Sequence, residues 1–295
     1  MTPSEYDYLR KLLKERSGLL LAADKHYLVE SRLLPIARKA GAAGLGGLVL
    51  KLQSIDSEAL AVEVVEAMTT NETFFFRDKM PFEHFTNVIV PALLAARAHD
   101  RRLRIWCAAA STGQEPYSLA MCLKEMATRL ADWQIEILAT DISNEVLEKA
   151  RTGIYNQFEV QRGLPIHLLL KYFTQVGEMW EIAPNLRAMV TFRPLNLLHS
   201  FAHLGTFDVI FCRNVLIYFG ADTKAEVLER LARVTAPDGY LTLGAAETVV
   251  GLTESFKPLP DRRGLYVPNP VALHGASGVV VDFAKPRMVA GGGAR

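Results

Sequence analysis

The chain is built around residues 103–118, which read LRIWCAAASTGQEPYS. The apolar run from Leu103 to Cys107 predicts a buried strand of a parallel sheet. The small residues that follow predict a turn where a ligand could approach the backbone closely, and Pro116 suits the first turn of a helix. A strand, a small-residue turn and a helix in this order are typical of the nucleotide site of a doubly wound α/β fold.

Glu115 indicates which kind of nucleotide would fit this turn. Ala108 and Ala110 stand where a dinucleotide fold would have glycines, and the carboxylate of Glu115 falls where a pyrophosphate would lie. That carboxylate would repel an anion and attract a cation or an amine. The turn therefore favours a positively charged ligand that carries a nucleoside over NAD.

Composition narrows the class of protein. The 295 residues suit one large or two small domains, and the net charge of +1 gives no general attraction to nucleic acid or to a membrane. Cys107, Cys122 and Cys212 lie in apolar segments without CxxC spacing, and the polar N-terminus shows no signal peptide, so a cytoplasmic protein is expected. His199 and His203 have no third ligand near them in the sequence, and no metal site is expected.

Residues 1–88 predict a helical N-terminal domain. Its second helix is expected to begin after Asp24 as N-cap and to run toward residue 40, with Pro35 kinking or splitting it. Lys25, Arg32 and Lys39 recur every seven residues and so share one face. A solvated face and a docking surface for an acidic partner helix both explain this pattern.

Residues 89–268 predict the parallel-sheet domain, and residues 269–295 a flexible tail. A second strand, at 134–140, leads into Asp141, where a doubly wound fold places the acid that binds a ribose diol; capping of the next helix is the alternative. Residues 207–214 predict another buried strand with a polar end. Pro237–Gly239 is expected to form a turn before a strand at 240–243.

Polar residues flank three consecutive phenylalanines between the two domains. The phenylalanines at 74–76 suit a core, whereas Asn71, Thr73 and Arg77 would need polar partners if they were buried. A polar ligand would supply such partners.

The motifs together resemble the chemotaxis receptor glutamate O-methyltransferases (the CheR family). The matching segments are Asn71-x-Thr73-x-x-Phe76-Arg77, ASTGQEPYS at 110–118, ATDIS at 139–143, Asn196-Leu197 and FDVIFCRNVLIYF at 207–219. The resemblance covers about residues 4–268. It implies an α/β fold with a doubly wound, mostly parallel sheet of the class I S-adenosylmethionine-dependent methyltransferases, Rossmann-like, beside a small all-helical domain.

The resemblance also implies a cofactor, S-adenosylmethionine, with S-adenosylhomocysteine as its product. Matching positions imply these cofactor contacts: Asn71, Thr73, Arg77, Glu115, Asp141, Asn196, Leu197, Arg213 and Asn214. Arg77 and Tyr218 would orient the substrate carboxylate, although a core position would also explain Tyr218. A glutamate with a pKa of about 4.3 is already ionised at neutral pH, so no general base is needed.

The implied partner is the acidic coiled coil of a chemoreceptor's cytoplasmic part, contacted by Lys25, Arg32 and Lys39 of a monomeric enzyme. A methyltransferase of another substrate, and a signalling module that binds the cofactor without turnover, are the alternatives. Some family members carry a three-stranded insert that grips a peptide at the receptor's C-terminus. The corresponding segment, about residues 171–190, looks short and holds few glycines for a hairpin, which predicts a member that does not need that tether.

Overall fold

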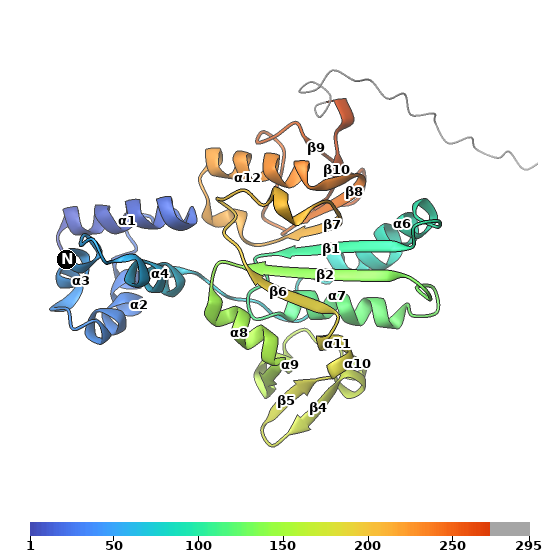
Figure 1. Cartoon of the computed structure of the whole chain (residues 1–295), viewed down its shortest axis with the longest axis horizontal. Helices are drawn as coiled ribbons and strands as arrows, with labels where there is room; N and C mark the ends of the chain where they lie inside the picture. Colours follow the sequence, from blue (N-terminus) through green and yellow to red (C-terminus); the bar gives the residue numbers. More distant parts are fainter. Residues whose placement is uncertain (272–295) are drawn as a thin grey trace, which may run out of the picture.

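The computed structural model describes residues 1–271, which form a helical N-terminal domain beside an α/β domain (Figure 1). The predicted tail lies outside the described residues from residue 272 onward. Within residues 1–271, no single helix is long and apolar enough to cross a bilayer. The helices His26–Lys39 and Gly44–Leu52 pass the same test only as a pair bent by 70°.

The N-terminal domain consists of four helices: α1 (Pro3–Ser17), α2 (His26–Lys39), α3 (Gly44–Leu52) and α4 (Glu58–Met68). Thr2 and Glu5 form a reciprocal capping box that begins α1. The helices share one apolar core, to which Leu9, Leu33 and Met68 contribute. The domain therefore has a hydrophobic core of its own.

Helix α2 differs from the prediction at its N-cap, and of the two predicted effects of Pro35 the split does not occur. It is not split at Pro35, which lies inside the continuous helix, and Lys25 rather than Asp24 occupies the N-cap without a side-chain cap bond. A proline inside a helix costs about 3 kcal/mol. Burial of Leu33 and Ile36 on either side of it offsets that cost and holds the helix in one piece.

The α/β domain contains a seven-stranded sheet in the order β6-β2-β1-β7-β8-β10-β9. Its strands are β1 (Arg102–Ala108), β2 (Gln134–Asp141), β6 (Val190–Pro194), β7 (Phe207–Cys212), β8 (Thr235–Leu243), β9 (Phe256–Pro258) and β10 (Leu265–Pro268). Strands β1, β2, β6, β7 and β8 are parallel, and β10 runs antiparallel to both of its neighbours. This confirms the doubly wound, mostly parallel sheet.

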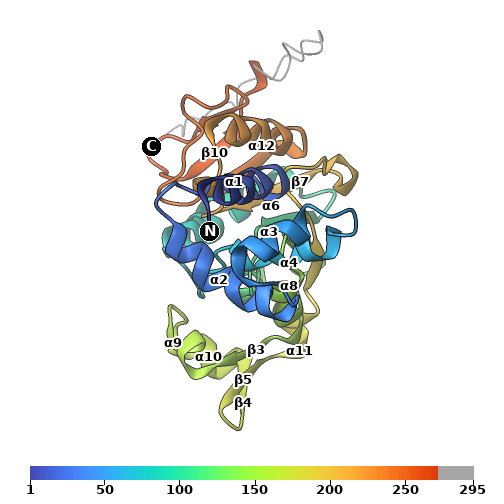
Figure 2. The same ribbon diagram turned by 90° about the vertical axis from the view of Figure 1, so that its left-hand side faces the viewer.

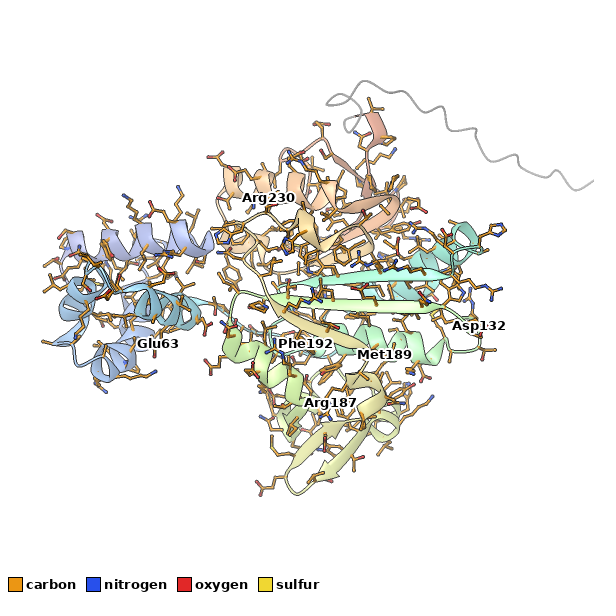
Figure 3. The ribbon with its side chains drawn as sticks, in the orientation of Figure 1. Glu63, Asp132, Arg187, Met189, Phe192 and Arg230 are labelled. Carbon is orange, nitrogen blue, oxygen red and sulfur yellow. The ribbon has the colours of Figure 1, made fainter. Side chains whose placement is uncertain are left out.

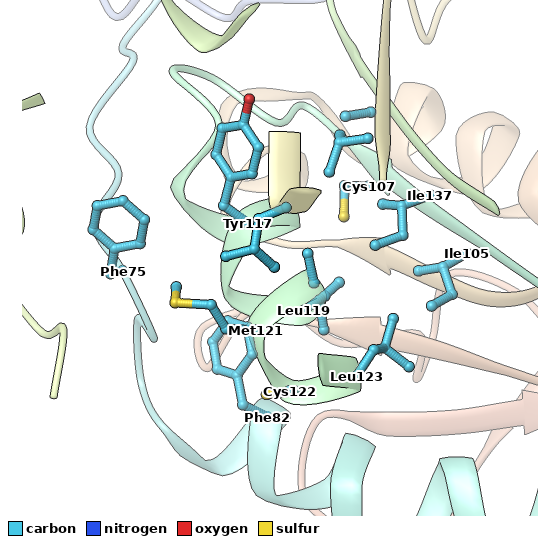
Figure 4. Packing of buried hydrophobic residues seen from close by; sticks show 14 of the residues in the cluster. Phe75, Phe82, Ile105, Cys107, Tyr117, Leu119, Met121, Cys122, Leu123 and Ile137 are labelled. Carbon is cyan, nitrogen blue, oxygen red and sulfur yellow. The ribbon is translucent and has the colours of Figure 1, made fainter. Parts of the chain in front are cut away.

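Helices cover both faces of the sheet. The helices of this domain are α5 (Met80–His84), the π-helix η1 (Phe85–Ile89), α6 (Val90–Ala96), α7 (Gln114–Glu125), α8 (Asn144–Thr152), α9 (Gln157–Gln161), α10 (Ile166–Tyr172), α11 (Pro184–Arg187) and α12 (Ala221–Arg233), with the 3-10 turns η2 (Ala202–Leu204) and η3 (Leu216–Tyr218). Helix α7 packs in one core cluster with Ile105 and Ile137 (Figure 4). Helix α12 packs in the other cluster, with Trp106.

The boundary between the hydrophobic core of the helical domain and that of the sheet falls between Met68 and Phe75 in the sequence. Met68 belongs to the core of the helical domain, whereas Phe85 belongs to the core of the sheet. Phe75 and Phe82 belong to the core of the sheet as well (Figure 4). Of the three consecutive phenylalanines, Phe75 is fully buried and its two neighbours are partly exposed. Residues 75–88, predicted to belong to the helical domain, thus pack on the α/β side.

The predicted turn at Pro237–Gly239 is part of strand β8. The pairing of β7 with β8 shifts register between Phe207 and Val209, opposite this segment. Such an irregularity accommodates a proline and a glycine inside a strand, so these residues mark a bulge rather than a chain reversal.

The three-stranded insert is present, although the segment at 171–190 looked short and poor in glycine for a hairpin. Strands β3 (Ile154–Asn156), β4 (Phe173–Val176) and β5 (Met179–Ile182) form an antiparallel sheet in the order β3-β5-β4. Figure 2 shows this sheet at the bottom of the molecule, away from helix α1. Gly177 alone, with φ 62°, supplies the tight turn between β4 and β5, and β3 comes from residues that precede the segment at 171–190.

Candidate functional site

A pocket lies between the helical domain and the carboxyl edge of the sheet. All ten residues predicted to contact cofactor or substrate carboxylate line it: Asn71, Thr73, Arg77, Glu115, Asp141, Asn196, Leu197, Arg213, Asn214 and Tyr218. It is also lined by residues that the sequence did not single out for the site: Ser17, Leu19, Thr69, Thr70, Glu72, Ala109, Ser111, Ile142, Leu195, Val215 and Phe219. Glu115, Asp141 and Asn214 come from the ends of three neighbouring parallel strands and so share one edge of the sheet.

The backbone around the pocket is unusual in conformation. Ala109, Ser111 and Asn214 adopt left-handed φ values of 62°, 49° and 57°. Such values are uncommon for residues other than glycine and cluster at functional sites. Gly113, with φ 93°, lies so close to its surroundings that an added Cβ would be 3.0 Å from the Cβ of Ala150. The turn after β1 is therefore held tightly in one shape.

Asp141 ends β2 and holds the two turns that border the pocket. Its Oδ2 accepts the N–H of Ser111 at 2.8 Å and its Oδ1 accepts the N–H of Ser143 at 3.0 Å. Burial raises the pKa of Asp141, and these backbone N–H groups oppose the rise. Each carboxylate oxygen has another lone pair for a ligand hydroxyl, so turn capping and ribose binding are compatible at this residue.

Glu115 lies at the start of α7 and forms a buried ion pair. Its Oε2 accepts Nη1 of Arg213 at 2.7 Å, and Arg213 also donates through Nη2 to Asp78 Oδ2 at 2.7 Å. The Arg213 side chain is only 1% exposed. Burial raises the pKa of Glu115, and the guanidinium of Arg213 opposes that rise. Arg213 thus stabilises a carboxylate that faces the pocket.

Arg77 and Tyr218 reach the pocket from two segments of the α/β domain: Arg77 follows Phe75 and Phe76, and Tyr218 ends the 3-10 turn η3. Nη1 of Arg77 donates to the carbonyl of Glu72 at 2.8 Å, and its guanidinium lies 5.6 Å from the Phe74 ring centre. The carbonyl of Tyr218 accepts the N–H of Leu20 at 2.9 Å. The Tyr218 hydroxyl forms no hydrogen bond with any part of residues 1–271, which leaves it available to a ligand.

Asn196 also joins the two domains. Its Nδ2 donates to the Arg16 carbonyl at 2.6 Å, and its Oδ1 accepts the N–H of Leu198 at 3.0 Å. The neighbouring Leu197 is buried, and Arg230, labelled on α12 in Figure 3, donates to its carbonyl. The Asn196 side chain, one of the implied cofactor contacts, is therefore held in place from both sides.

The three basic residues predicted to bind a partner helix lie outside the pocket and have partners within the helical domain. Arg32 donates to the carbonyls of Met68 at 2.8 Å and Thr69 at 2.7 Å. Lys39 pairs with Glu63, labelled in Figure 3, at 2.7 Å, and Lys25 lies 3.5 Å from an Asp24 oxygen. Arg32 thus tethers the end of α4, next to the linker that lines the pocket.

The pocket's donor and acceptor groups suit S-adenosylmethionine. Glu115 offers a carboxylate for the methionine ammonium, Asp141 offers one for the ribose hydroxyls, and apolar Leu197 can cover the adenine face. Fold and site together define the class: a Rossmann-like, S-adenosylmethionine-dependent methyltransferase. Bound S-adenosylmethionine would supply an activated methyl group at this site.

Comparison with known proteins identifies the family. Residues 4–69 match the CheR methyltransferase all-alpha domain, and residues 71–265 match the CheR methyltransferase SAM binding domain. The chain therefore belongs to the CheR methyltransferase family.

Two relatives are similar over nearly their whole length. The chemotaxis protein methyltransferase Cher2 of Pseudomonas putida is 41% identical over 265 residues, which cover 88% of this chain and 96% of that protein. The chemotaxis protein methyltransferase of Escherichia coli K12 is 36% identical over 263 residues, which cover 87% and 88%. Among solved structures, PKMT2 from Rickettsia typhi with AdoHcy matches 59% of this chain and 26% of that one at 12% identity and a TM-score of 0.35.

Proposed function

We propose that this protein transfers the methyl group of S-adenosylmethionine to glutamate side chains of chemoreceptors and forms glutamate methyl esters for sensory adaptation. The observation that carries the proposal is a single pocket that joins buried carboxylates to Arg77 and Tyr218. Relatives named as chemotaxis protein methyltransferases support the biological setting.

The chain's own residues would bind and align the reactants. Glu115 and Asp141 hold the cationic nucleoside, while Arg77 and the Tyr218 hydroxyl orient the carboxylate of the substrate. That carboxylate is ionised at neutral pH because its ordinary pKa is about 4.3, so no side chain has to remove a proton. Catalysis then rests on holding an anionic oxygen in line with the methyl carbon.

The partner in this proposal is the acidic coiled coil of a receptor's cytoplasmic part, with the enzyme acting as a cytoplasmic monomer. Lys25 and Lys39, which keep 41% and 75% of their side-chain surface exposed, can contact acidic side chains of that coil. Arg32 contributes by fixing α2 to the end of α4.

The test is methyl transfer from tritiated S-adenosylmethionine to a receptor's cytoplasmic fragment. Label that base treatment releases as methanol identifies a glutamate methyl ester. Arg77→Ala is expected to lower kcat/KM about 100-fold, because it removes one of the groups that orient the carboxylate. Arg102→Ala is the matched control. Arg102 lies at the opposite end of β1, where it is exposed and forms only a loose ion pair with Glu136 at 3.9 Å, so its loss should leave turnover unchanged.

The alternatives give different results in the same assay. Base-stable label, or label on a small molecule alone, would replace the proposal with a methyltransferase of another substrate. Tight binding of S-adenosylhomocysteine without any transferred label would replace it with a binding module.

A further inference from the structure

The carboxylate of Glu247 gathers backbone N–H groups from two segments. Its Oε2 accepts the N–H of Gly244 at 2.7 Å and of Asn214 at 2.8 Å. Its Oε1 accepts the N–H of Leu216 at 2.8 Å and of Val215 at 3.0 Å. Successive backbone N–H groups that point at one anion form a strong, geometrically specific site, and here the chain's own carboxylate fills it.

The segment held in this way carries part of the pocket. Asn214 and Val215 line the pocket and Tyr218 follows two residues after Leu216, whereas Glu247 is not among the lining residues. Asn214 has a left-handed φ of 57°, a conformation that needs support from its surroundings. Glu247 accepts four charge-assisted bonds from this segment, because the N–H of Ile217 also donates to its Oε1 at 3.3 Å, and these bonds provide that support.

Gly244 shows how closely the two segments approach. A Cβ at this position would lie 2.7 Å from Oε2 of Glu247 and 3.0 Å from the backbone nitrogen of Asn214. Any side chain here would push the carboxylate away from the loop. Gly244 at the end of β8 and Glu247 therefore act as one structural unit.

We propose that Glu247 is a positioning residue: through the backbone of residues 214–216 it sets Asn214 and Val215 against the cofactor and Tyr218 toward the substrate carboxylate. The part that concerns Tyr218 rests on the proposed function, whereas the part that concerns cofactor binding does not. Glutamine would keep one acceptor oxygen and place an NH2 group against N–H donors, so the loop would lose its fixed shape.

The experiment measures two quantities for Glu247→Gln in the full chain. Calorimetry is expected to show the Kd for S-adenosylhomocysteine rising about 3- to 10-fold, because Asn214 and Val215 shift. The ester assay is expected to show kcat falling about 10-fold or more, because Tyr218 loses its orientation. In the Tyr218→Phe background the same substitution should change kcat by less than about twofold, since both changes act through one group.

Two further variants keep the test decisive. Gly244→Ala keeps the carboxylate of Glu247 but displaces it from the loop, so this variant should show the same rise in Kd and fall in kcat. It replaces Glu247→Gln in the test if that variant fails to fold. Glu229→Gln is the matched control: its carboxylate accepts the hydroxyls of Thr253 and, at 2.8 Å, Ser255, so its loss should lower thermal stability without changing Kd or kcat.

A Kd within about twofold of wild type, or kcat losses that multiply in the double variant, would overturn the inference. If the wild-type chain forms no ester at all, the proposed function fails, and the Kd measurement still decides the role of Glu247.

Discussion

Replacing Asp141 by asparagine separates its two roles at the pocket. The carboxylate accepts two backbone N–H groups, at 2.8 and 3.0 Å, and asparagine offers only one acceptor oxygen. One buried N–H then faces an NH2 group, which is expected to lower the free energy of unfolding by about 1–3 kcal/mol. If the same carboxylate also binds the ribose, the binding free energy of the cofactor weakens by about 1.5–3 kcal/mol, and its Kd rises about 10- to 100-fold.

Urea unfolding and calorimetry with S-adenosylhomocysteine measure these two quantities separately. Asp208→Asn is the matched control, because Asp208 is equally buried but lies near the amino ends of β1 and β7, where it accepts the N–H of Arg104 at 2.7 Å and pairs with Arg97 at 2.6 Å. It should lose stability and keep its cofactor affinity. An Asp141→Asn variant that behaves like this control would refute the ribose assignment and leave Asp141 as a turn cap alone.

Three other predictions follow from the geometry. Lowering the pH from about 7.5 to about 5 should weaken binding of S-adenosylhomocysteine. Burial raises the pKa of Glu115, and the ligand's ammonium group binds only the ionised form of this carboxylate. Calorimetry on Glu115→Gln should show a flatter pH dependence of the Kd. Arg32→Ala should raise both the cofactor Kd and the KM for receptor, since Arg32 holds the end of α4. Lys39→Ala should raise only the KM for receptor, because Lys39 pairs with Glu63 on the surface. Identical effects of the two variants would contradict the role given to Arg32 in holding α4. Gly113→Ala should lower the free energy of unfolding by about 1–3 kcal/mol more than Gly177→Ala, because both have positive φ but only Gly113 is crowded, and equal losses in urea unfolding would argue against crowding.

Much of the site could be predicted because parallel strands end at the same edge. Asp141 ends β2 and Asn214 follows β7, so the order of the strands alone brings these residues together. Glu115 could be placed for the same reason, since it follows the turn after β1. A strand followed by a polar residue is a local pattern and is visible in the sequence.

Contacts between distant residues could not be predicted in this way. Glu247 lies more than 30 residues beyond the loop that it holds, and nothing in its own neighbourhood marks it as a ligand of that backbone. Arg32 shows the converse. Its spacing suggests an exposed basic face, whereas the fold brings the carbonyls of Met68 and Thr69 within its reach. The insert was missed because β3 and β5 are separated by residues that fold as α9 and α10.

The sequence by itself determined the alternation of strands and helices, the strand ends that carry polar residues, and the acidic turn after β1. These features depend on local spacing and on residue chemistry. Only the tertiary structure decided that the end of α1 and the linker at 69–73 close the pocket, that Arg213 is bound between Glu115 and Asp78, and that Glu247 supports the loop at 214–216. The reason is physical: a buried charge or N–H group takes whichever partner the folded chain brings within about 3 Å, and separation along the sequence does not limit that choice.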